Sequence, residues 1–122
     1  MDISKEDYLR VMYELGEDKI RSVSVADRLD ISKSSVSQMI KKLQEEKLVV
    51  ALPYSKITLT KKGREEGKRI THNHNVIVIF LKKVLGLKGK SVNEEAHLLE
   101  HAFSQEGIDK LNRFLKDKGY KK

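Results

Sequence analysis

A short segment near the C-terminus carries the residue types that bind metal ions. His97, Glu100 and His101 stand at positions i, i+3 and i+4, so on an α-helix their side chains leave the same face within about one turn. Imidazole and carboxylate groups are ligands for divalent transition metals. The spacing therefore predicts that a helix over residues 93–101 forms part of a metal site.

Composition and charge limit what kind of chain holds this site. The 122 residues include no cysteine, which excludes disulfides and thiolate metal sites. No apolar run approaches the ~20 residues that span a bilayer, and the N-terminus lacks a secretion signal, so we expect a cytoplasmic protein with no membrane partner. The net charge is +7, and residues 33–69 alone carry +6. This clustering indicates a polyanionic partner.

Serine-led start signals predict the helices of the first half. Ser4 and Asp7 resemble a capping box, and an apolar stripe at helical spacing follows them. Ser24 repeats the capping pattern before a short helix. Ser32 is the expected cap of the next helix, whose apolar residues over 36–43 follow i, i+3, i+4 and i+7. Two helices joined by a three-residue connection make a helix-turn-helix.

A predicted hairpin follows this helix pair. The β-prone runs 48–52 and 56–59 flank Pro53-Tyr54-Ser55, as in the wing of a winged helix. Short hydroxyls and a glutamine near a helix N-terminus suit base edges and phosphates, and lysines suit phosphates. The candidate DNA-binding residues are Ser32, Ser34, Ser35, Ser37, Gln38, Lys41 and Lys42 of the helix, with Tyr54 and Lys56 of the wing.

The second half is expected to be entirely helical. A long helix runs from Thr60 to about Leu85, although its segment 76–81 has strand propensity. Because that segment is apolar on all sides, it must be buried on several faces, which indicates a subunit interface. Ser91 to Glu94 should cap the metal-site helix, Ser104 should start the last helix, and residues 118–122 should fray. The fold is thus mainly α, with a winged helix-turn-helix DNA-binding domain over 1–71 and a helical dimerisation and metal-binding domain over 72–122.

The spelling H-x-x-E-H also marks a class of zinc peptidases. In such an enzyme Glu100 would be the general base, and His74 could supply a third ligand. A winged helix has no role in peptide hydrolysis, however, and the motif adjoins an apolar helix that should be buried. We therefore expect no enzyme and no catalytic residue.

With these elements the chain resembles the metal-dependent repressors of the diphtheria-toxin-repressor and manganese-transport-regulator family, in a short two-domain form. The likeness covers nearly the whole chain. It rests on the segments 6–9, 36–39 and 59–63, on His74, and on Glu95-Ala96 through Glu100-His101-Ala102-Phe103-Ser104.

The resemblance implies a metal site and a function. Asp7, His74, His97, Glu100 and His101 would be the ligands, and three neutral imidazoles with two carboxylates give a neutral set for a 2+ ion. The protein would be a homodimer that represses transcription from operator DNA when loaded with metal, and so controls metal homeostasis. An ion shared by Asp7 and the other ligands would clamp the two domains and fix the spacing of the recognition helices, about one DNA turn (~34 Å) in such dimers.

Three departures from the family bear on the metal. Arg10 stands where manganese regulators offer a second carboxylate, Val78 where an acid often serves a second ion, and Asn93 where iron regulators have an ancillary histidine. We therefore expect one ion per subunit. His97 makes the site rich in nitrogen, which favours iron(II), zinc or cobalt by ligand type, whereas the resemblance favours manganese or iron. The remaining alternative is a winged-helix regulator that senses an organic ligand; we expect no small organic substrate.

Overall fold

The computed structural model describes residues 3–122, and the chain divides into two compact units, Met1–Thr71 and His72–Lys122. Both units are built mainly from helices, which confirms the predicted fold class. No helix within residues 3–122 has the length and apolar character needed to cross a membrane.

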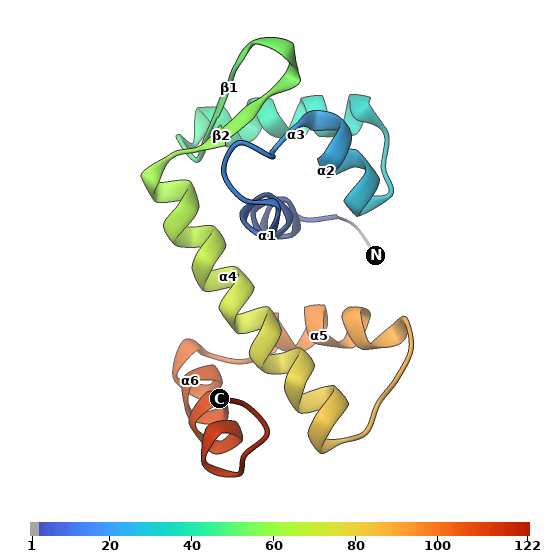
Figure 1. Cartoon of the computed structure of the whole chain (residues 1–122), viewed down its shortest axis with the longest axis vertical. Coiled ribbons are helices and arrows are strands. Elements are labelled where there is room, and N and C mark those ends of the chain that lie inside the picture. Colours follow the sequence, from blue (N-terminus) through green and yellow to red (C-terminus); the bar gives the residue numbers. More distant parts are fainter. Residues whose placement is uncertain (1–2) are drawn as a thin grey trace. The chain divides into compact units, whose positions relative to one another are not determined.

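Within the described residues, three complete helices, a hairpin and the first part of a fourth helix form the N-terminal unit (Figure 1). The hairpin is antiparallel, with Val49 opposite Leu59 and Ala51 opposite Ile57, and the predicted wing is therefore present. One face of each element supplies a shared apolar core in which Leu9, Met12 and Leu43 are fully buried. The elements are α1 (Lys5–Leu15), α2 (Ser22–Leu29), α3 (Lys33–Glu45), β1 (Val49–Ala51), the 3-10 turn Pro53–Ser55, β2 (Ile57–Leu59) and the start of α4 (Lys61–Ile79).

The helix starts confirm two of the three predicted serine caps. Ser4 and Asp7 form a capping box, and the Ser32 hydroxyl accepts a hydrogen bond from the Ser35 N–H. Ser24 as a cap was wrong, because α2 begins two residues earlier, at Ser22. Its start is set by tertiary pairing, since the Ile57 N–H donates to the Ile20 carbonyl at 2.9 Å and holds that segment extended against the wing.

The start of α4 lies against residues 47–48, which immediately precede β1. The Thr60 hydroxyl donates to the Lys47 carbonyl at 2.7 Å and accepts from the Gly63 N–H at 3.0 Å. A Cβ on Gly63 would lie 2.0 Å from the Leu48 carbonyl oxygen, which leaves no room for a side chain. Only glycine allows this approach, and it fixes where the long helix leaves the wing.

Helices also form the whole of the C-terminal unit. It contains the end of α4, a π-helical turn η2 (Phe80–Val84), α5 (Ser91–Ala102) and α6 (Gln105–Asp117). The β-prone segment 76–81 is helical, as predicted, because its apolar side chains are buried or partly buried in the core of this unit and tertiary packing outweighs strand propensity. The core residues are Val76, Ile77, Leu81, Val92, Ala96, Ile108 and Leu115.

Two expectations for this unit were wrong and one is confirmed. Ser104 caps α6, accepting from the Gly107 N–H at 3.0 Å. Ser91 is already inside α5, whose N-cap is Lys90 without a side-chain hydrogen bond. The predicted fraying is wrong for the first residues of the tail: Gly119 adopts a left-handed φ of 81°, and the Tyr120 N–H donates to the Leu115 carbonyl at 2.8 Å. This is a Schellman motif, and it places Tyr120 against the core.

Replacement of Gly63 tests the close contact between α4 and the wing. We expect Gly63→Ala to lower the free energy of unfolding by roughly 1–3 kcal/mol, because the new methyl group must push the helix off the Leu48 carbonyl. Urea unfolding followed by circular dichroism measures the change. Glu65→Ala, on an exposed position of the same helix, should stay within about 0.5 kcal/mol of the parent; equal losses in both variants would contradict the role of the contact.

Candidate functional site

Two predicted metal ligands from different helices of the C-terminal unit meet. His74 Nδ1, from α4, is hydrogen-bonded to Glu100 Oε1, from α5. Both side chains are mostly buried, with exposed fractions of 10% and 15%. An imidazole beside a carboxylate in a poorly solvated position is a donor pair suited to a divalent cation.

The other two candidates of this unit lie one turn apart on α5. The His97 and His101 rings make an edge-to-face contact with centroids 4.8 Å apart, so the predicted i, i+4 neighbourhood is present. Within residues 3–122, however, no three histidine, aspartate or glutamate side chains gather closely enough to hold a metal ion. The four side chains thus include two contacting pairs, His74–Glu100 and His97–His101.

Asp7, the fifth candidate, belongs to the N-terminal unit and already has several partners there. Its Oδ2 accepts from the Ser4 N–H at 2.9 Å and from the Ser4 hydroxyl at 3.0 Å. Its Oδ1 lies 3.7 Å from Arg10 Nη2. The carboxylate thus stabilises the start of α1 and forms an ion pair with a neighbouring guanidinium.

The candidate DNA-binding residues of α3 divide into two rows on the exposed side of the helix. Ser37 and Lys41 line a groove of about 210 Å³ between α3 and the wing. Ser35, Gln38 and Lys42 line a shallow surface on the other side, towards Ile31 and Tyr8. The side chains of Val36, Ile40 and Leu43 hold the opposite face of α3 in the core. Ser32 and Ser34 are exposed at the helix start.

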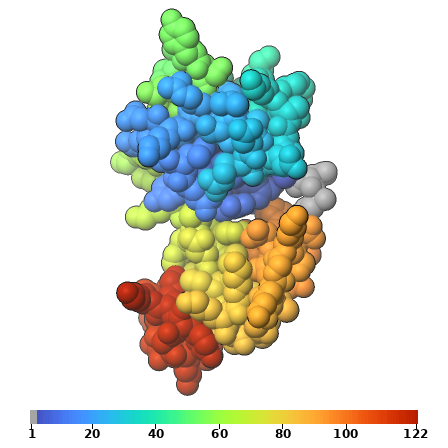
Figure 2. Space-filling model, turned by 45° about the vertical axis from the view of Figure 1, so that its right-hand side comes forward, coloured from blue at the N-terminus to red at the C-terminus, as the bar shows by residue number. Residues whose placement is uncertain are grey.

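The wing tip presents one aromatic side chain to solvent. Tyr54 is 92% exposed and has a left-handed φ of 63°, a conformation that costs free energy for a residue with a side chain and that is often kept at binding sites. The tip projects from the surface in Figure 2, where it is green. Lys56, at the base of the tip, is held 3.5 Å from Asp18.

Two residues of this surface were missed from the sequence. Gln44 lines the groove with Lys41, and helical periodicity could have found it, since it lies seven residues after Ser37. Arg21 Nη1 donates to the Tyr54 carbonyl at 3.5 Å, which brings another positive charge to the wing. No local signal could have identified Arg21, because its position depends on the long-range pairing of residues 20–21 with the wing.

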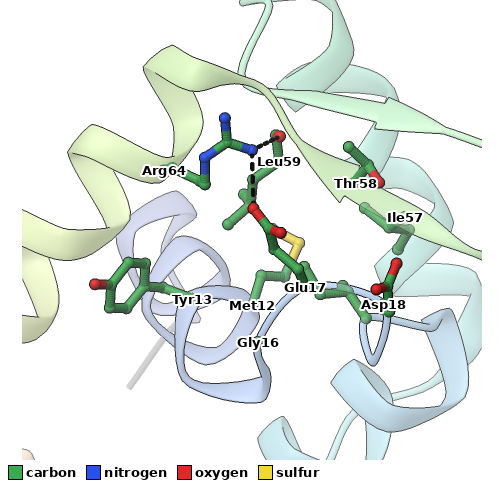
Figure 3. Close-up of a pocket in the computed structure, with 10 residues that line it drawn as sticks. Met12, Tyr13, Gly16, Glu17, Asp18, Ile57, Thr58, Leu59 and Arg64 are labelled. Carbon is green, nitrogen blue, oxygen red and sulfur yellow. Dashed lines mark hydrogen bonds and ion pairs between the residues drawn. The ribbon is translucent and has the colours of Figure 1, made fainter.

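A pocket of about 400 Å³ lies behind the wing, between the end of α1, β2 and the start of α4 (Figure 3). Its charged wall is internally paired: Arg64 Nη1 is 3.4 Å from Glu17 Oε1 and donates to the Leu59 carbonyl at 3.1 Å. These bonds tie the loop after α1 to α4 and β2. The wall therefore has a structural role in positioning the wing.

Comparison with known protein families identifies both halves of the chain. Residues 3–57 match the iron dependent repressor N-terminal DNA binding domain. Residues 60–120 match the iron dependent repressor metal binding and dimerisation domain. The two pairs of candidate ligands on α4 and α5 lie within the second match.

Two curated relatives are similar to this chain over most of its length. An uncharacterised HTH-type transcriptional regulator of Methanocaldococcus jannaschii is 43% identical over 94% of this chain and 94% of its own length. The HTH-type transcriptional regulator MntR of Bacillus subtilis is 31% identical over 88% of this chain and 77% of its own length.

Solved structures extend the similarity to the fold. The manganese regulator SloR is 36% identical with a TM-score of 0.82 over 95% of this chain. A manganese-dependent transcriptional repressor in complex with manganese is 33% identical with a TM-score of 0.75 over 92% of this chain. This chain spans about half of those longer chains, 55% and 52% respectively.

Removal of one charge from the α3 groove tests the candidate DNA-binding surface. Lys41→Gln should weaken binding to duplex DNA and lower the salt dependence of log K by ~1, because one phosphate contact and its released counterion are lost. Fluorescence anisotropy across a salt series measures both quantities. Lys82→Gln changes the net charge equally in the other unit and should leave the slope unchanged; a matching loss would mean that net charge alone governs binding.

Proposed function

This chain belongs to the family of iron-dependent repressors, and on that premise we propose that metal binding at a five-ligand site lets it bind operator DNA as a homodimer. It is a metal-dependent transcriptional repressor that acts in metal homeostasis, and it is not an enzyme. The proposed ligands are Asp7, His74, His97, Glu100 and His101, with one ion per subunit.

The observation that carries the proposal is the contact between His74 and Glu100. The two residues come from helices α4 and α5, which are separated by a π-helical turn and a loop, and their meeting depends on the folded core of this unit. Such a mostly buried pair within a metal-binding domain supports a ligand role for both residues.

The donor chemistry of the set fits a divalent transition metal. Neutral imidazoles and carboxylates bind Mn²⁺, Fe²⁺, Zn²⁺ and Co²⁺. Among the similar structures, one repressor is in complex with manganese, and ScaR is found with bound Zn²⁺ and with bound Cd²⁺. We propose manganese or iron(II) as the physiological metal, with zinc and cobalt as alternatives that the nitrogen-rich set also accommodates.

When bound, the metal supplies a fixed positive centre that several side chains can share. His74 and Glu100 hold the end of α4 to α5, and His97 and His101 extend the donor set along α5. Asp7 contributes a carboxylate from α1, the first helix of the DNA-binding unit. Sharing an ion in this way would reduce the freedom of the recognition helices and raise the affinity for two half-sites.

Exposed apolar side chains of the C-terminal unit support a homodimer. Leu98 is 63% exposed, and Leu85 and Phe114 are about half exposed. Large apolar side chains on the surface of a domain assigned to dimerisation are suited to a second copy of the same chain. The dimer would bring two α3 helices to successive major grooves.

A DNA-binding titration in controlled metal buffer tests the proposed function. The protein is titrated against its own promoter region in EDTA and then with Mn²⁺, Fe²⁺, Zn²⁺ and Co²⁺ in turn. We expect the cognate metal to tighten specific binding about 5- to 150-fold, and Glu100→Ala to abolish that gain while the circular dichroism spectrum stays unchanged.

Glu95→Ala is the matched control, because it removes a carboxylate from an exposed position of the same helix. It should keep the full metal response. Equal operator binding by Glu100→Ala and the parent across the whole metal titration would overturn the proposed ligand set. Operator binding that ignores every metal would instead favour a regulator controlled by an organic ligand.

A further inference from the structure

Arg10 holds a position on α1 from which it contacts a proposed metal ligand. Its Nη2 lies 3.7 Å from Asp7 Oδ1, and its Nη1 lies 3.3 Å from Glu14 Oε1. The side chain is only 19% exposed, and that of Asp7 only 15%. Water screens such a pair less than a fully exposed one, so the charge of Arg10 acts on Asp7 at short range.

We propose that Arg10 is a built-in cationic competitor for the metal at Asp7. This inference rests on the proposed function, in which Asp7 is a ligand. A carboxylate oxygen that already faces a guanidinium gives up that interaction when it binds a cation, and a guanidinium that stays nearby repels a 2+ ion. Both effects lower the metal affinity of the protein and raise the metal concentration at which it responds.

The remaining contacts show where the guanidinium can withdraw. Glu14 Oε1 accepts from Arg10 Nη1 and also from Arg28 Nη2, at 3.0 Å. Arg10 therefore lies between two carboxylates, and loss of the Asp7 contact leaves it paired with Glu14. The same Glu14 joins α1 to Arg28 of α2, so the charge of Asp7 is linked by consecutive ion pairs to the first helix of the helix-turn-helix.

The other oxygen of Asp7 limits how the carboxylate can respond. Oδ2 accepts both Ser4 bonds of the capping box, and breaking them would cost helix stability. Oδ1 is the oxygen that faces Arg10. Asp7 can therefore keep the capping box if it binds a cation through Oδ1, the oxygen that faces Arg10.

Metal affinity of the full-length protein tests the inference. Competition with a chromophoric chelator gives the Kd for Mn²⁺ and for Co²⁺ in the absence of DNA. We expect Arg10→Gln to tighten metal binding about 3- to 10-fold, because the variant removes one partly screened positive charge that repels the metal ion. Arg10→Lys keeps the positive charge beside Asp7 and should not tighten metal binding as Arg10→Gln does.

Glu14→Gln is the matched control on the same helix. It removes the alternative partner of Arg10, leaves the guanidinium with Asp7, and should not tighten metal binding. A second readout, the melting temperature in EDTA, reports whether each variant folds. If Arg10 had only a structural role, its replacement would lower the melting temperature without tightening metal binding.

The outcomes separate this inference from the proposed function. If the parent protein bound no metal, the proposed function itself would be overturned. Parent protein that binds metal, with folded Arg10→Gln at equal or weaker affinity, would overturn the role of Arg10 and leave the repressor function intact. Tighter binding in Glu14→Gln as large as in Arg10→Gln would also overturn it, because the effect would not then depend on the charge beside Asp7.

Discussion

One helix, α4, takes part in the core of both units, and the rest of the molecule depends on where it begins. Gly63 allows its first turn to lie against the Leu48 carbonyl, and the Thr60 hydroxyl accepts from the Gly63 N–H and donates to the Lys47 carbonyl, just before β1. Ile70 belongs to the first core, whereas Val76 belongs to the second. Because the start of α4 is fixed, the residues that enter the first core and those that enter the second are fixed as well. His74 lies between Ile70 and Val76, where α4 leaves the first core and enters the second.

The sequence predicted features that local hydrogen bonds decide. Ser4, Ser32 and Ser104 cap helices because a hydroxyl three residues ahead of a free N–H suffices. Ser24 and Ser91 have the same spelling but lie inside helices, because other constraints set those starts. For α2 the constraint is the pairing of Ile20 with Ile57, a contact across 37 residues that no local pattern reports.

In the candidate sites, too, local sequence patterns predicted some features, whereas others depend on contacts between distant residues. Periodicity placed the polar residues of α3 on one exposed side and His97 one turn from His101. It could not predict that His74 meets Glu100, because that contact requires the π-helical turn and the loop to return α5 against α4. Nor could it divide the α3 residues into a wing-side row and a second row, since the division depends on where the wing packs.

Charge balance explains how an arginine can stand beside Asp7, a proposed metal ligand. Asp7, Arg10, Glu14 and Arg28 alternate in sign, so each interior group has an opposite charge on both sides. If a metal contact replaced the Asp7–Arg10 contact, Arg10 would still be paired with Glu14. The free-energy cost would then be the loss of one ion-pair contact, which is several-fold smaller than the cost of leaving a buried charge without a partner. If Asp7 is a ligand as proposed, this network would permit metal binding while opposing it, and a sensor that must ignore trace metal needs both properties.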